Sequence, residues 1–240
     1  MLEAEVQLSL ESRQVGRVTI VRCQGRIIAG KESESLREHI SWVLRDRRYI
    51  VLHLGEVPFI DSSGIGTMVR ALATTRQTRG DLKLCNVPEN IRKVLEMTRL
   101  TSVFDLHDSE ETAVGAFYGS DYAPGGQPHS PLPAGRAILC IDSNLDVLAY
   151  LRELLRRAGY EVQSTNRASD ALLLMRVTRF DLLLVGPDKV ASPSSPQAFR
   201  DACSRLPVIE LGNEFSTLVA GDAATGLLEK IRSQFDAKSA

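Results

Sequence analysis

The sequence predicts two α/β domains joined by a linker. Apolar runs of strand length alternate with amphipathic helical segments in both halves of the chain, the pattern of sheets covered by helices. Between the halves, YGSDYAPGGQPHSPLPAGR (118–136) contains four prolines and almost no aliphatic side chains, as linkers do. We therefore expect a domain with a mixed sheet at 1–117, a linker at 118–135 and a domain with a doubly wound parallel sheet at 136–240.

The composition restricts the function classes. A chain of 240 residues with 43% hydrophobic residues can bury two ordinary cores. Its 29 Lys and Arg nearly cancel its 30 Asp and Glu, so no global field points to nucleic acid or to an anionic membrane. Apolar runs such as DALLLM fall far short of a membrane span, and the initial MLEAEVQLSLESR lacks the features of a leader. We expect a cytoplasmic protein with neither a nucleic-acid nor a membrane partner.

The cysteines and histidines show no catalytic or metal-binding spacing. The cysteines occur singly in apolar segments, which predicts reduced core residues, and the histidines lie far apart: Cys23, Cys85, Cys140, Cys203, His39, His53, His107 and His129. His53 alternates with Leu52 and Leu54, so we interpret it as a strand residue and not as a base. We therefore predict no catalytic residue, no metal and no cofactor.

In the first domain, hydrophobic periodicity defines the elements. Strands are predicted at 17–25, 49–55 and 81–87, and helices at 33–46, after Asp61, at 88–100 and at 108–119. The second of these helices is predicted from apolar residues at i, i+3, i+4 and i+7, namely Ile65, Met68, Val69 and Leu72.

The second domain repeats the alternation. Strands are predicted at 137–143, 161–166, 180–187 and 207–213, and helices at 145–159, 168–179, 195–205 and 223–235. Leu148, Leu151 and Leu155 line one face of the first helix, and Gly159 is placed to end it. Continuous apolar strands between such helices predict a sheet covered on both faces.

The stretch VPFIDSSGIGTMVRAL (57–72) places an acid, two serines and two glycines between a strand and a helix. Either Asp61 or Ser62 fits the helix N-cap, which is a sufficient structural explanation. The alternative is a switch, because an anion is stabilised at a helix N-terminus and a phosphoryl group there changes what can dock. The residues alone leave both explanations open.

The first domain resembles the STAS domain of anti-sigma-factor antagonists. The resemblance covers roughly residues 5–117 and includes DSSGIG in its strand-to-helix context and the downstream GDLKLCNVPENIRKVLEMTRLTSVF. It implies phosphorylation of Ser62, with Ser63 in reserve, by an anti-sigma-factor kinase of the histidine-kinase-like ATPase type, and dephosphorylation by a PP2C-like phosphatase. It also implies a partner-binding surface formed by Asp61, Ser62, Ser63, Gly64, Ile65 and Gly66.

One departure concerns the loop after the second predicted strand. Much of the family has an acid in a G-x-L-D sequence there, whereas this chain reads GRIIAGKESESL, with no acid at Gly25 to Ile28. The departure concerns the choice of partner and leaves the serine unchanged.

The second domain resembles a two-component receiver that has lost its chemistry. A receiver needs an acidic pair for Mg²⁺ and an aspartate that accepts the phosphoryl group. Here the pair becomes Asp142 and Ser143, the acceptor position is Gly186, and the position of the hydroxyl residue is Gly212. Asp188 is a poor substitute because it follows Pro187. We expect a pseudo-receiver that pairs with a second copy or docks a partner.

Together these observations predict a bacterial signalling protein, not an enzyme, that acts by partner switching. Reversible phosphorylation of Ser62 would control its binding to the kinase. The alternative is a phosphorylation-independent scaffold or dimerisation protein built from two degenerate signalling domains, in which Ser62 only caps a helix.

Overall fold

The computed structural model describes residues 7–119, 136–187, 196–204, 206–212 and 220–236. These ranges leave out residues 120–135, which make up most of the predicted linker. They also leave out residues 188–195, which include Asp188. Contacts divide the chain into two compact units, residues 1–124 and 125–240. Each unit has its own sheet.

The N-terminal unit contains a mixed five-stranded sheet in the order β1-β2-β3-β4-β5. Its strands are β1 (Ser9–Val15), β2 (Val18–Gln24), β3 (Tyr49–Glu56), β4 (Asp81–Cys85) and β5 (Asp105–His107). β1 runs antiparallel to β2, and the other neighbours are parallel. The three predicted strands are confirmed as β2, β3 and β4. The other two, β1 and β5, were not predicted.

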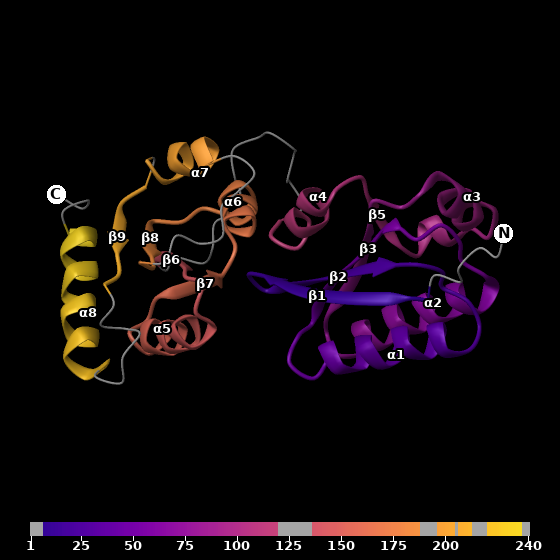
Figure 1. The fold of residues 1–240 in the computed structure, drawn as a ribbon, viewed down its shortest axis with the longest axis horizontal. Coiled ribbons are helices and arrows are strands. Elements are labelled where there is room, and N and C mark those ends of the chain that lie inside the picture. The colour runs from indigo at the N-terminus through magenta and orange to yellow at the C-terminus, as the bar shows by residue number, and fades with distance from the viewer. Residues whose placement is uncertain (1–6, 120–135, 188–195, 205, 213–219, 237–240) are drawn as a thin grey trace. The chain divides into compact units, whose positions relative to one another are not determined.

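The helices of this unit are α1 (Lys31–Val43), α2 (Ser62–Gln77), α3 (Glu89–Met97) and α4 (Glu110–Gly115). α1 and α2 lie side by side against one face of the sheet, and α4 lies on the other side of the strands (Figure 1). The larger core contains Leu36 and Ile40 of α1, Met68 and Leu72 of α2, and the inward residues of β2, β3 and β4. Of the predicted apolar face of α2, Met68 and Leu72 are therefore buried, while Ile65 and Val69 are half-buried and pack against the core.

The C-terminal unit contains a wholly parallel sheet in the order β7-β6-β8-β9. Its strands are β6 (Ala137–Ile141), β7 (Glu161–Thr165), β8 (Leu182–Val185) and β9 (Val208–Glu210). Its helices are α5 (Leu145–Arg157), α6 (Ala168–Val177), α7 (Pro196–Cys203) and α8 (Ala220–Asp236). α5 and α6 lie on opposite sides of the strands (Figure 1). Residues of α5 and α8 share one core with β6, β7 and β8.

The cysteines are free in the structure, as the sequence predicts for reduced residues. Cys23, Cys85 and Cys140 are buried, and burial raises their thiol pKa values, to about 12 for Cys23 and Cys140. Cys203 is only half-buried. The prediction of a core position is therefore wrong for Cys203.

Candidate functional site

The candidate site lies where the segment leaving β3 meets the loop leaving β2. The amide of Ile27 donates to the Phe59 carbonyl at 3.1 Å, and the amide of Asp61 donates to the Ile27 carbonyl at 3.2 Å. These bonds form a short parallel bridge between Ile27 and Ile60. The start of α2 is thereby fixed beside the β2–α1 loop.

Asp61 is the N-cap of α2 and also binds the neighbouring loop. Its Oδ1 accepts from the Gly64 amide at 2.8 Å, and its Oδ2 accepts from the Ala29 amide at 2.9 Å. These two amides hold the pKa of the Asp61 carboxyl below its ordinary value, and the charge of Arg26 adds to the effect. Asp61 is therefore an ionised carboxylate, and both of its oxygens accept hydrogen bonds from the backbone.

Ser62 is the first residue of α2, and its side chain is exposed. Its hydroxyl forms no hydrogen bond with any residue in the described part of the chain, and the cap is supplied by Asp61. Of the two predicted N-cap candidates, the structure thus selects Asp61. The Ser62 hydroxyl is left accessible at the positive end of a helix of 16 residues.

The next residues of the predicted surface differ in their access to solvent. Ser63, Ile65 and Gly66 are half-buried, and Gly64 is buried. A Cβ on Gly64 would lie 2.3 Å from the carbonyl oxygen of Ile27, so only glycine allows the helix to approach the loop this closely. A Cβ on Gly66 would meet nothing closer than Arg70, at 3.6 Å. Gly64 is therefore structural, and Ser62 is the more accessible of the two serines.

Phe59 and Arg26, whose contact the sequence did not predict, lie in the two segments that meet at the start of α2. Phe59 is 46% exposed although it is a large apolar residue, and the guanidinium of Arg26 lies 5.1 Å from its ring centroid. Arg26 belongs to the loop in which the sequence lacks the family's acid. This edge of the site consequently presents a cation over an aromatic ring.

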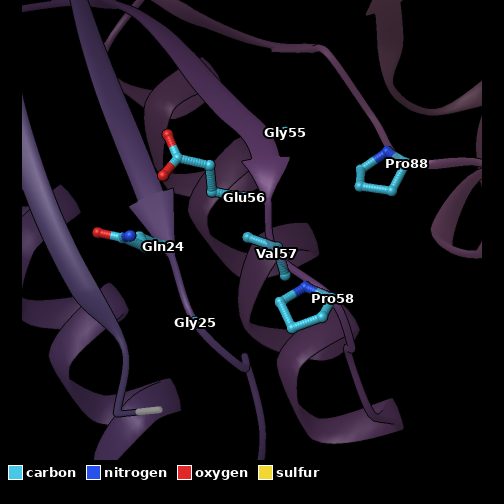
Figure 2. A pocket seen from close by; sticks show the side chains of 7 residues that line it. All are labelled: Gln24, Gly25, Gly55, Glu56, Val57, Pro58 and Pro88. Carbon is cyan, nitrogen blue, oxygen red and sulfur yellow. The ribbon is translucent and has the colours of Figure 1, made fainter.

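A shallow groove of about 420 Å³ opens at the carboxyl ends of β2 and β3. It is lined by Gln24, Gly25, Gly55, Glu56, Val57, Pro58 and Pro88. Figure 2 shows Val57 and Pro58 between Gln24 on one side and Pro88 on the other. Because Pro58 directly precedes Phe59, the groove and the start of α2 belong to one continuous segment of chain.

Part of this chain is similar to known proteins. Residues 9–113 match the family model of the STAS domain. The chain is 28% identical over 99 residues to the putative anti-sigma factor antagonist BtrV of Bordetella bronchiseptica, covering 41% of this chain and 85% of BtrV. It is 27% identical over 111 residues to the anti-sigma F factor antagonist of Paenibacillus polymyxa, covering 45% of this chain and 94% of that protein.

Two solved structures also align with part of this chain. The Bacillus cell fate determinant SpoIIAA in its phosphorylated form aligns with a TM-score of 0.39 and 22% identity, covering 45% of this chain and 99% of SpoIIAA. An anti-sigma factor antagonist from Mycobacterium paratuberculosis aligns with a TM-score of 0.43 and 20% identity, covering 48% of this chain and 97% of that protein.

The other face of the N-terminal sheet carries a charged cluster around Glu110 of α4. Arg13 forms an ion pair with the Glu110 carboxylate, while Arg22 Nη2 lies 3.7 Å and His53 Nε2 lies 4.0 Å from its Oε1. Burial lowers the pKa of His53. The Gly55 amide donates to His53 Nδ1 at 3.3 Å. This cluster attaches α4 to three strands of the STAS domain.

No metal site or membrane span is found in the ranges that the structure describes. No three His, Cys, Asp or Glu side chains among these residues are grouped to hold a metal ion. None of the helices in the same ranges is both long and apolar enough to cross a bilayer.

In the C-terminal unit, the structure brings together two of the residues singled out from the sequence. Asp142 is buried, and its Oδ1 accepts from the Asn144 amide at 2.7 Å. A Cβ on Gly186 would lie 2.0 Å from Asp142 Oδ2. The space where a side chain at residue 186 would start is thus occupied by the Asp142 carboxylate.

Proposed function

We propose that this protein is a partner-switching signalling protein in which reversible phosphorylation of Ser62 controls binding to an anti-sigma-factor kinase. The observation that carries the proposal is the position of Ser62. Its hydroxyl is exposed at the first residue of α2, while the capping that would otherwise explain it is done by Asp61. No hydrogen bond among the described residues involves this hydroxyl.

The physical effect of the modification supports a switch. A phosphoryl group adds about 1.5 to 2 negative charges at neutral pH. It would be added next to the ionised carboxylate of Asp61 and three residues after the exposed Phe59. A partner that packs on Phe59 and the start of α2 would then have to bury several negative charges, which is costly unless each is paired.

The similarity to anti-sigma factor antagonists fits this proposal. Two curated relatives are an anti-sigma factor antagonist and a putative one. From them we infer that the partner is an anti-sigma factor. The sequence resemblance further specifies a kinase of the histidine-kinase-like ATPase type and a PP2C-like phosphatase that restores the free hydroxyl. The protein itself would then be a substrate in the cytoplasm and catalyse nothing.

For the C-terminal unit, we propose a receiver-like domain without phosphotransfer, used for pairing with a second copy or for docking. The parallel strand order and the contact between Asp142 and the Gly186 position support it. An aspartate at residue 186 would compete with the Asp142 carboxylate for the same space, so no acceptor can be placed there without displacing Asp142.

The experiment that tests the switch compares Ser62→Ala and Ser62→Glu as baits in lysates of the native cells. Bound proteins with a histidine-kinase-like ATPase domain are identified and quantified by mass spectrometry. The Ser62→Ala protein should retain such a kinase, and the Ser62→Glu protein should lose it. Ser63→Glu is the matched control. Equal retention by the Ser62→Ala and Ser62→Glu baits would favour the phosphorylation-independent scaffold.

A further inference from the structure

Ser62, Gly66 and Arg70 form one row along the exposed side of α2. They are spaced four residues apart, so they follow one another on the same face of the helix. Ser62 and Arg70 are exposed, and Gly66 between them has no side chain. Nothing from Gly66 therefore separates the side chains of Ser62 and Arg70.

The Arg70 side chain runs back toward the start of the helix. A Cβ on Gly66 would lie 3.6 Å from Arg70 Nη1 and 3.9 Å from Nη2. Nη2 also donates to the Thr67 hydroxyl at 3.1 Å. The guanidinium therefore lies over Gly66, and one helical turn, about 5.4 Å along the axis, separates that position from Ser62.

Arg70 also lacks a counter-ion. No carboxylate in the described ranges forms an ion pair with it. The next arginine of the same helix, Arg76, has its Nε 3.0 Å from Asp81 Oδ1. Among the described residues, Arg70 thus keeps a guanidinium available for an anion, and it lies near Gly66, one turn from Ser62.

Two of the backbone amides at the start of α2 are already engaged in hydrogen bonds. The Gly64 amide donates to the Asp61 carboxylate at 2.8 Å, and the Ile65 amide donates to the Asp61 carbonyl at 3.0 Å. The charge of Arg26 already acts on the Asp61 carboxylate. The Gly64 and Ile65 amides are thus engaged within the protein, which favours a side-chain cation as a partner of a phosphoryl group on Ser62.

We propose that Arg70 is the intramolecular counter-ion of phosphorylated Ser62. This inference rests on the proposed modification of Ser62. A guanidinium binds a phosphoryl group with two parallel hydrogen bonds, which a lysine cannot match. Phosphorylation would then change the surface twice, because it adds charge at Ser62 and engages the Arg70 guanidinium one turn further along.

The test uses the full chain with phosphoserine inserted at position 62 during translation, so no kinase is needed. The pH dependence of the ³¹P chemical shift gives the second pKa of the phosphoryl group. In the otherwise unchanged protein, this pKa should be lower than in the Arg70→Gln variant by roughly half a unit, the size expected of an exposed ion pair. Arg70→Lys should give an intermediate value.

The matched control is Arg76→Gln, which removes the same charge from the same helix. It should leave the second pKa of the phosphoryl group close to that of the unchanged protein. Equal values for the unchanged protein, Arg70→Gln and Arg76→Gln would overturn the role of Arg70. Such a result would leave the proposed switch standing, because that switch is tested by kinase binding to the Ser62 variants.

Discussion

At the scale of single residues, helix capping and the proposed phosphorylation involve different side chains. Asp61 accepts two amide protons and joins α2 to the β2–α1 loop, whereas Ser62 carries an exposed hydroxyl with no hydrogen bond among the described residues. An exposed side chain that forms no hydrogen bond can be modified with little loss of folding stability. This separation makes the account testable by stability alone.

Replacing Ser62 by alanine should leave the free energy of unfolding unchanged within about 0.5 kcal/mol, as for other exposed positions. Asp61→Ala should cost about 1–2 kcal/mol because it removes the cap. Urea unfolding followed by fluorescence measures both, since the only tryptophan, Trp42, lies on α1 of the STAS domain. A loss for Ser62→Ala as large as that for Asp61→Ala would mean that Ser62 has a structural role.

The lowered pKa of Asp61 predicts a dependence of stability on pH. Since the folded-state pKa lies below the unfolded value, the carboxylate contributes stability that is complete above the ordinary value of 3.8 and is lost as the pH falls through the folded-state pKa. Asp61→Asn should therefore lose less stability than the unchanged protein as the pH falls below 3.8. Parallel losses of unfolding free energy would contradict this assignment.

At the scale of elements, the close approach of α2 to the β2–α1 loop determines where glycine is required. Gly64→Ala should destabilise the STAS domain by about 1–3 kcal/mol, the usual cost of overpacking, because its Cβ would meet backbone. Gly66→Ala is the matched control two residues along the helix. It should be neutral or stabilising by up to about 1 kcal/mol, the helix propensity gain. Similar losses in both variants, measured by urea unfolding, would argue against the described packing.

Much of the element order follows from the sequence, and the misses have physical causes. β2, β3 and β4 are apolar runs in which packing and propensity agree. β1 was missed because SLESRQV is polar and lies at the sheet edge, where one face is solvated. β5 has three residues, too few for a periodic pattern.

The sequence predicts the motif of the candidate site but does not predict the positions of its side chains. DSSGIG identifies the strand-to-helix turn, but which residue caps the helix depends on the Ala29 amide, 32 positions away in sequence. The contact between Arg26 and Phe59 and the direction of Arg70 likewise depend on tertiary placement. Local sequence carries no signal for such contacts.

At the scale of the whole molecule, a domain that we propose to be phosphorylated is joined to one that we propose to be unable to accept phosphate. Gly186→Ala should destabilise the C-terminal unit by about 1–3 kcal/mol, because its Cβ would clash with Asp142. Hydrogen exchange of β6 in the full chain should then accelerate. Gly226→Ala on α8, where a Cβ would meet nothing within 4 Å, is the control and should not accelerate exchange. Unchanged exchange in Gly186→Ala would refute this packing.

The most direct test of the central claim is phosphopeptide mapping of the protein isolated from its native cells under several growth conditions. Trypsin releases YIVLHLGEVPFIDSSGIGTMVR (49–70), and fragment ions distinguish Ser62 from Ser63. The account predicts phosphate on Ser62 with an occupancy that changes with growth condition. An abundant unmodified peptide with no phosphate on Ser62 under any condition would contradict it.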